Sequence, residues 1–322
     1  MPTPHMTPSS DRIPILIVAG FLGAGKTTFI RDLLPRLANV PRAPYVILND
    51  FLNAAIDAFT LKGLGAEIKG LVAGCVCCDD SDSLIDAILR VPISIRPLVI
   101  IEANGTTDPF RLIETLTLTA SLREVIGPIL QVTAINEARW AKRQLPADKE
   151  IERAQVRTAS AILTNRGEFA TDQQKQRLRD DLLELNPRAP RLDAETFVEL
   201  LLRETAADIL PAPDTSDPIP HGHHHVAVHV EPPAISEDRL RQWLLGLPRD
   251  ILRVKGLARL SETEMAYFNR TDDPFESPRI IKVRAQEGMK PAAVFIGPGL
   301  REEFLRASFR EASVPRPFKL TL

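Results

Sequence analysis

The sequence predicts an α/β protein: a mostly parallel sheet with helices on both faces, followed by a smaller C-terminal α+β domain. Three observations predict it. Short, almost continuously apolar runs alternate with helical patterns up to residue 205; a glycine-rich loop follows the first run; and a stretch rich in proline and histidine then ends the alternation. Strands buried on both faces give continuous apolar runs, and their alternation with helices is typical of a parallel sheet.

The apolar runs are expected to form the strands of the parallel sheet, because they are short and rich in β-branched residues. They span residues 13–20, 45–50, 98–103, 129–136 and 160–165. Helical patterns lie between them, over residues 26–37, 81–90 and 172–185. This order places the end of each strand next to the start of a loop or helix, where ligands bind in open α/β sheets.

The chain is predicted to have four parts. They are a flexible lead over residues 1–12, a larger α/β domain over 13–205, a linker over 206–225 and a smaller second domain over 226–322. In the second domain a helix is expected after Ser236 as its N-cap. Strands over 279–285 and 292–297 and a helix over 300–312 are expected to follow.

Composition excludes several classes of protein. Hydrophobic residues make up 44% of the chain and charged residues 25%, with a net charge of −2, so no basic surface for nucleic acid or anionic lipid is indicated. The amino-terminal residues are polar and lack the apolar core of a signal peptide. No apolar run approaches the roughly 18 residues of a spanning helix. We therefore expect a cytoplasmic protein that binds neither nucleic acid nor membrane.

The segment Gly20–Thr27, "GFLGAGKT", fits the phosphate-binding pattern G-x-x-x-x-G-K-[ST] directly between a predicted strand and a predicted helix. Glycines let the backbone turn its N–H groups toward phosphate oxygens. Lys26 supplies a positive charge to the outer phosphates, and the Thr27 hydroxyl is suited to Mg²⁺. The sequence thus predicts a P-loop NTPase-type domain.

A nucleotide hydrolase also needs an acid near the phosphates. Glu102 ends the apolar run "LVIIE", before an expected turn at Asn104–Gly105. Asp50 ends the run "YVILND" and is a second candidate, near the nucleotide or a metal. The alternative for Glu102 is a strand-terminal side chain that faces solvent.

All three cysteines of the chain, Cys75, Cys77 and Cys78, lie within four residues. Thiolates are soft ligands suited to zinc, cobalt and copper. Two or three ligands are too few for a closed four-coordinate site, so an open site, suited to transfer, is indicated; Asp50, water or a partner could complete it. The alternatives are a redox pair, since Cys75 and Cys78 have C-x-x-C spacing, and simple packing.

Four histidines follow in the linker: His221, His223, His224 and His225. Imidazole binds zinc, copper and nickel, so these residues are candidate auxiliary metal ligands. The alternative is a solvated linker that binds metal weakly and adventitiously.

Taken in order, the motifs "GFLGAGKTT", "VILNDF", "GCVCC", "IEANGTTDP", "ILTNRGE" and "LNPRA" closely resemble those of the CobW-like metallochaperone GTPases, of the CobW/HypB/UreG type. The segment 247–260 resembles the start of that family's C-terminal domain. The resemblance implies hydrolysis of GTP with Mg²⁺, coupled to delivery of a transition metal, zinc or cobalt, to a client metalloprotein.

The resemblance also implies roles for individual residues. The catalytic group is Lys26, Thr27 and Glu102, with Thr27 on Mg²⁺. The metal ligands are Cys75, Cys77 and Cys78. The nucleotide-binding residues are Gly20, Gly23, Ala24, Gly25, Lys26, Thr27, Thr28, Asn165, Arg166 and Glu168.

The chain departs from the family pattern at three strand ends. Asn49-Asp50-Phe51-Leu52 replaces Asn-Glu-Phe-Gly, Asn136 replaces an Asp, and the guanine motif Asn-Lys-x-Asp becomes Asn165-Arg166-Gly167-Glu168. The property that these departures are expected to change most is the preference for guanine over other bases. The departures at Asp50 and Glu168 leave open a second class, a nucleotide-binding metal sensor with little turnover. A third class, a small-molecule kinase or synthetase, would share only the phosphate loop.

Overall fold

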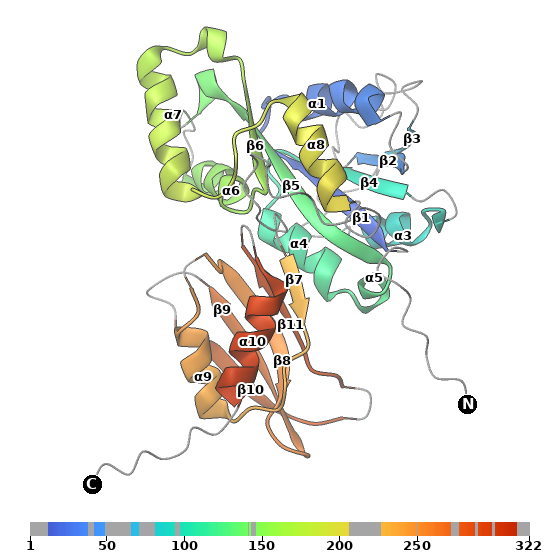
Figure 1. Ribbon diagram of the computed structural model, residues 1–322, viewed down its shortest axis with the longest axis vertical. Helices are drawn as coiled ribbons and strands as arrows, with labels where there is room; N and C mark the ends of the chain where they lie inside the picture. The colour runs from blue at the N-terminus through green and yellow to red at the C-terminus, as the bar shows by residue number, and fades with distance from the viewer. Residues whose placement is uncertain are drawn as a thin grey trace, which may run out of the picture. The chain divides into compact units, whose positions relative to one another are not determined.

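The computed structural model describes residues 12–37, 42–48, 66–70, 81–93, 97–140, 142, 146–205, 227–248, 250–271, 277–286, 289–297 and 300–313. The chain divides into two compact units, Met1–Val226 and Ala227–Leu322. Each unit has its own sheet (Figure 1).

The sheet of the first unit has six strands in the order β3-β2-β4-β1-β5-β6, and all of its pairs are parallel. The strands are β1 (Ile13–Ala19), β2 (Ala43–Leu48), β3 (Glu67–Gly70), β4 (Pro97–Glu102), β5 (Ile126–Asn136) and β6 (Ala161–Asn165). Every residue of β1 and β4 is buried, which explains their continuous apolar sequences. The predicted parallel α/β fold is confirmed.

Helices and short 3-10 turns connect these strands. They are α1 (Lys26–Leu33), η2 (Leu34–Leu37), α3 (Ser81–Leu89), α4 (Pro109–Leu118), α5 (Ala120–Arg123), η4 (Glu137–Arg139), α6 (Pro146–Arg157), η5 (Gly167–Phe169), α7 (Asp172–Leu185) and α8 (Ala194–Thr205). The single helix expected over 26–37 is wrong: the α-helix ends at Leu33 and a 3-10 turn follows. Pro35 has no N–H to continue the helical ladder, and its ring clashes with the preceding turn.

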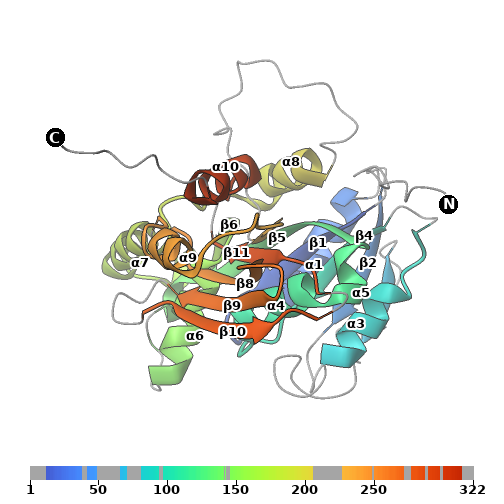
Figure 2. The ribbon, with the colours of Figure 1, turned by 90° about the horizontal axis from the view of Figure 1, so that it is seen from below.

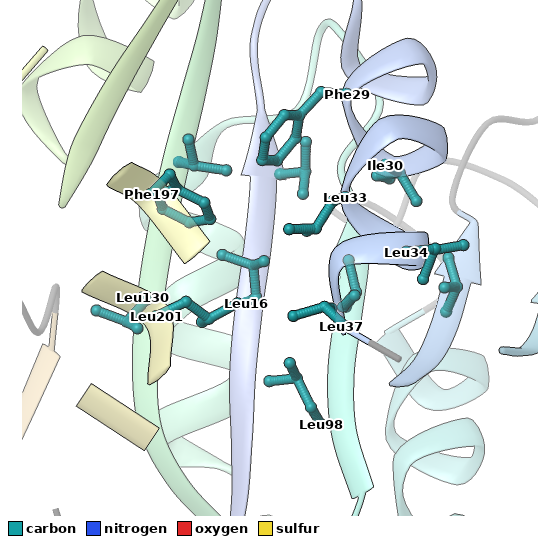
Figure 3. Close-up of a cluster of buried hydrophobic side chains, with 14 of the residues drawn as sticks. Leu16, Phe29, Ile30, Leu33, Leu34, Leu37, Leu98, Leu130, Phe197 and Leu201 are labelled. Atoms are coloured by element: carbon teal, nitrogen blue, oxygen red, sulfur yellow. The ribbon is translucent and has the colours of Figure 1, made fainter. Parts of the chain in front are cut away.

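Two apolar clusters attach the helices to opposite faces of this sheet. One joins α1 and α8 to the strands, with the rings of Phe29 and Phe197 in edge contact at 5.6 Å between centroids (Figure 3). The other packs Leu178 and Leu182 of α7 against Ile135 and Ile162. Since helices cover both faces, the carboxyl ends of the strands are the expected place for a ligand in such a sheet.

The second unit has a five-stranded sheet in the order β10-β9-β8-β11-β7, with antiparallel pairs. Its elements are β7 (Ala227–Val230), α9 (Glu237–Leu245), β8 (Arg253–Arg259), β9 (Glu264–Thr271), β10 (Arg279–Arg284), β11 (Ala292–Ile296) and α10 (Glu302–Ser313). Helices α9 and α10 lie together on one face of the sheet (Figure 2). The predicted smaller α+β domain is confirmed.

Side chains of both helices meet in the core of the second unit. Trp243 of α9 stacks on Phe309 of α10, with 3.6 Å between ring centroids. Ser236 takes the predicted N-cap position of α9 with an extended backbone, but its side chain makes no capping hydrogen bond. Among the described residues, no helix combines the length and the apolar composition needed to cross a bilayer.

Candidate nucleotide site

The loop between β1 and α1 has a backbone that requires glycine. Gly20, Gly23 and Gly25 have φ values of 137°, 74° and 94°, which lie in the region that L side chains rarely adopt. A Cβ on Gly20 would also collide with the carbonyl oxygen of Ala134 on β5. The sequence pattern of glycines therefore reflects both the turn itself and its close packing on the sheet.

The amino end of α1 has no side-chain cap. Its N-cap is Gly25, whereas at the starts of α4 and α7 the side chains of Asp108 and Thr171 accept capping hydrogen bonds from backbone N–H groups. The first N–H groups of a helix have no partner within the helix and carry a partial positive charge. An uncapped helix start that follows a glycine loop is suited to bind an anion such as phosphate.

Lys26 lies over the same loop. Its side chain is 9% exposed, and Nζ donates a hydrogen bond to the carbonyl oxygen of Gly20 at 2.9 Å. This bond joins the two ends of the loop and holds the ammonium group against it. The positive charge is therefore already in place beside the backbone N–H groups that bind phosphate in such loops.

Thr27, in the first turn of α1, meets Glu102, the last residue of β4. Thr27 Oγ1 donates a hydrogen bond to Glu102 Oε1 at 2.7 Å, and Glu102 is only 3% exposed. The alternative of a solvent-facing Glu102 is therefore wrong. A hydroxyl and a carboxylate at this distance are hard oxygen ligands of the kind that Mg²⁺ takes together with substrate phosphates, so the residues present fit this ion.

The segment that follows Glu102 packs on the phosphate loop. A Cβ on Gly105 would lie 2.6 Å from the backbone nitrogen of Leu22, so the two backbones are in close contact. Gln155 of α6, which is 1% exposed, donates from Nε2 to the carbonyl oxygens of Gly105 at 3.1 Å and Thr107 at 3.3 Å. Gln155 thus fixes the backbone of residues 105–107 against α6. The sequence does not reveal this role, because a glutamine in a polar helix carries no distinguishing signal.

The segment after β6 is the predicted base-reading motif. Asn165 Nδ2 donates to the carbonyl oxygen of Ala24 at 2.6 Å, which ties this segment to the phosphate loop. Arg166 has a left-handed backbone with φ of 56°, and η5 follows it directly. Arg166 and Glu168 are both exposed. Asn165 thus has a position fixed by the fold, while Arg166 and Glu168 present free surface to a ligand.

The 3-10 turn η4 lies beside both the phosphate loop and the base-reading motif, which the sequence did not reveal. A Cβ on Gly167 would lie 3.0 Å from Glu137 Oε2, so the Glu137 carboxylate adjoins the base-reading motif. A Cβ on Gly23 would lie 3.3 Å from Arg139 Nη1, so the Arg139 guanidinium adjoins the phosphate loop. The sequence signal for these two residues is their position in the chain, directly after β5.

Two buried amide oxygens lie at the same edge of the sheet. Asn136 ends β5, Asn165 ends β6, and the two are partners in the strand register. Within the described part of the chain, Oδ1 of each is buried without a hydrogen-bond partner. Buried polar atoms are normally satisfied, so these two are consistent with a polar ligand at this edge.

The predicted transition-metal ligands lie outside the described residues. This holds for Asp50, for Cys75, Cys77 and Cys78, and for His221, His223, His224 and His225. The residues that the structure does describe contain no group of three His, Cys, Asp or Glu side chains able to hold a metal ion.

A parallel sheet with a phosphate loop, a buried acid on the neighbouring strand and an asparagine tied to the loop defines a P-loop nucleotide-binding protein. Residues 14–193 match the family model for the CobW/HypB/UreG nucleotide-binding domain, and residues 226–313 match that for the cobalamin synthesis protein cobW C-terminal domain. The chain belongs to the CobW/HypB/UreG family, as its motifs indicated.

Characterised relatives are similar over much of the chain. A zinc chaperone CobW from Sinorhizobium sp is 28% identical over 300 residues, which cover 78% of this chain and 82% of that protein. The zinc chaperone YjiA of Escherichia coli is 31% identical over 186 residues, or 55% of this chain and 56% of the relative. A crystal structure of a zinc-bound triple mutant of the YjiA GTPase covers 94% of this chain and is itself covered to 99%, with 20% identity and a TM-score of 0.46.

Proposed function

We propose that this protein is a GTP-hydrolysing metal chaperone, in which nucleotide binding and hydrolysis are coupled to the delivery of a transition metal. The observation that carries the proposal is the hydrogen bond from Thr27 to the buried Glu102, beside Lys26 and an uncapped helix start. This arrangement has the parts that phosphoryl transfer to water needs: donors for the phosphates, a fixed cation and oxygen ligands for Mg²⁺.

Each residue has a separate task in hydrolysis. The loop N–H groups from Gly20 to Thr28 bind the phosphate oxygens, and Lys26 exchanges its bond to the Gly20 carbonyl for the outer phosphates. Thr27 and Glu102 would hold Mg²⁺, which neutralises charge on the phosphates when bound. Positioning and electrostatic stabilisation provide most of the catalysis in this reaction class, so a slow intrinsic rate is expected until a partner completes the site.

Guanine is the proposed base. A carboxylate accepts hydrogen bonds from the guanine ring N–H and amino group, and adenine has no such pair of donors. Glu168 carries the required charge and two acceptor oxygens, on a stem one methylene longer than that of the usual aspartate. Arg166 can stack its planar guanidinium along the base. GTP is therefore preferred over ATP, by less than an intact motif would give.

The proposed cargo is Zn²⁺ or Co²⁺, bound through Cys75 and Cys77 with Cys78 as a further ligand. Support comes from the soft-ligand chemistry of thiolates and from the relatives, which are named zinc chaperones. Asp50 is a candidate for a remaining position, and His221, His223, His224 and His225 are candidates for weaker auxiliary binding. The receiving partner would be the metal-free form of a client metalloprotein, which supplies the last ligand.

A cobalt titration tests the cargo. The wild-type protein should bind about one Co²⁺ tightly and show thiolate-to-metal charge-transfer absorption. The affinity should fall as pH is lowered, because the ligand thiols must lose protons to bind. The double variant Cys75→Ser/Cys77→Ser should lose the absorption while GTP binding persists. Unchanged Co²⁺ binding by this double variant would refute the thiol site.

A further inference from the structure

Arg139 is the last residue of η4, the 3-10 turn that directly follows β5, and its guanidinium lies beside the phosphate loop. A Cβ built on Gly23 would lie 3.3 Å from Arg139 Nη1, at a loop residue whose φ is 74°. Gly23 lies between Gly20 and Lys26, within the loop that fits the phosphate-binding pattern. The guanidinium is therefore at the rim of the phosphate site and approaches it from the β5 side.

The backbone that carries Arg139 is fixed by its neighbour. Trp140 is 7% exposed, and its Nε1 donates to Asp181 Oδ2 on α7 at 2.7 Å. The Trp140 N–H also closes η4 by donating to the Asn136 carbonyl oxygen at 3.0 Å. Trp140 anchors the turn, so Arg139 is placed beside Gly23 without its own side chain contributing to the anchor.

The positive charge of Arg139 is not compensated within the described part of the chain. The side chain is exposed, and no described residue gives it a hydrogen bond or an ion pair. The acid of the same turn, Glu137, lies against Gly167 instead. A guanidinium is charged at every physiological pH and binds phosphate oxygens through paired N–H donors.

We propose that Arg139 binds the phosphate chain of the nucleotide, as a second cation of the site beside Lys26. This proposal rests on the proposed function, because it concerns the same bound nucleotide. It adds a contact that the glycine-rich loop alone does not provide. Since Lys26 is nearly buried and Arg139 is exposed, Arg139 can close onto the phosphates after the nucleotide has entered.

Titrations of GDP, GTP and ADP into the full chain test this contact. Arg139→Ala and Arg139→Gln should weaken the binding of both GDP and GTP by about tenfold, near the lower end of what a hydrogen bond to a charged group contributes. Arg139→Lys should restore part of the loss, since it keeps the charge but not the paired donors. Arg179→Ala is the matched control: its guanidinium is exposed on α7, bonded to Gln176 at 2.6 Å, and affinity should not change.

The comparison with ADP separates a phosphate contact from a base contact. GDP and ADP share the same phosphate chain, so Arg139→Ala should weaken both by the same factor and leave their affinity ratio unchanged. The affinity for ADP is measured by competition against labelled GDP, with ADP at up to millimolar concentration. Glu168→Ala should do the opposite, because it changes the ratio and not the phosphate contact.

Two results would overturn the assignment of Arg139. The first is a GDP and GTP affinity within twofold of the wild type in Arg139→Ala, and the second is a loss confined to guanine nucleotides. In either case a wild-type protein that still binds and hydrolyses GTP leaves the proposed function intact. A wild-type protein that binds no nucleotide removes the proposed function and this inference together.

Discussion

The phosphate side and the base side of the candidate site are built differently. On the phosphate side, Lys26 and Glu102 are 9% and 3% exposed, and each is bonded to another element of the loop region. On the base side, among the described residues of the motif, Asn165 is tied to the loop, while Arg166 and Glu168 lie on an exposed turn. The proposed phosphate contacts are thus built into the fold, whereas the proposed base contacts come from surface side chains that can change without disturbing the core.

The largest expected effect comes from the phosphate side. Lys26→Ala removes the cation that is held against the loop, so it should weaken GTP and ATP together and lower turnover by about 10²–10³-fold or more. Phosphate release at saturating nucleotide measures the rate. Lys149→Ala, an exposed lysine on α6, is the control and should keep the wild-type rate. A Lys26→Ala protein with full activity would remove the enzyme interpretation.

A smaller and more selective effect is expected from the base side. Glu168→Ala should erase the preference for GTP over ATP while binding through the phosphate loop persists. A charge-assisted hydrogen bond contributes about 2 kcal/mol, so the loss should be at most about 30-fold in GTP affinity and near zero in ATP affinity. Glu184→Ala, another exposed glutamate, is the control. Equal affinities for GTP and ATP in the unmutated protein would contradict the guanine assignment.

The smallest effect on hydrolysis is expected from the linker. Deletion of residues 221–225 removes the candidate auxiliary metal ligands, none of which is among the proposed nucleotide-binding residues. It should lower the number of Zn²⁺ ions bound, with the weakly held ions lost first, and leave GTP turnover unchanged. Replacing the same five residues by Gly and Ser at constant length is the control for linker shortening. Loss of turnover in both variants would assign the linker a role in catalysis.

The strands of the first sheet were predictable because burial on both faces leaves a simple apolar signature, as in β1 and β4. The edge strand β3 was not placed, since Glu67 and Lys69 interrupt that signature. The phosphate loop and Glu102 were recognisable from local pattern alone. The contacts from Gln155 to Gly105 and from Arg139 to Gly23 were not, because they join segments that only the folded sheet brings together.

The central claim is that the nucleotide site and the metal site act on each other. The most direct test measures Zn²⁺ affinity with and without a saturating, non-hydrolysable Mg²⁺-GTP analogue, in the wild-type protein and in Lys26→Ala. A metal chaperone predicts a shift of about fivefold or more in Zn²⁺ affinity, the lower end of typical coupling between two sites, in the wild type only. Because linkage is reciprocal, Zn²⁺ must shift the affinity for the analogue by the same factor. An unchanged Zn²⁺ affinity, in a wild-type protein that binds both ligands, would contradict the account.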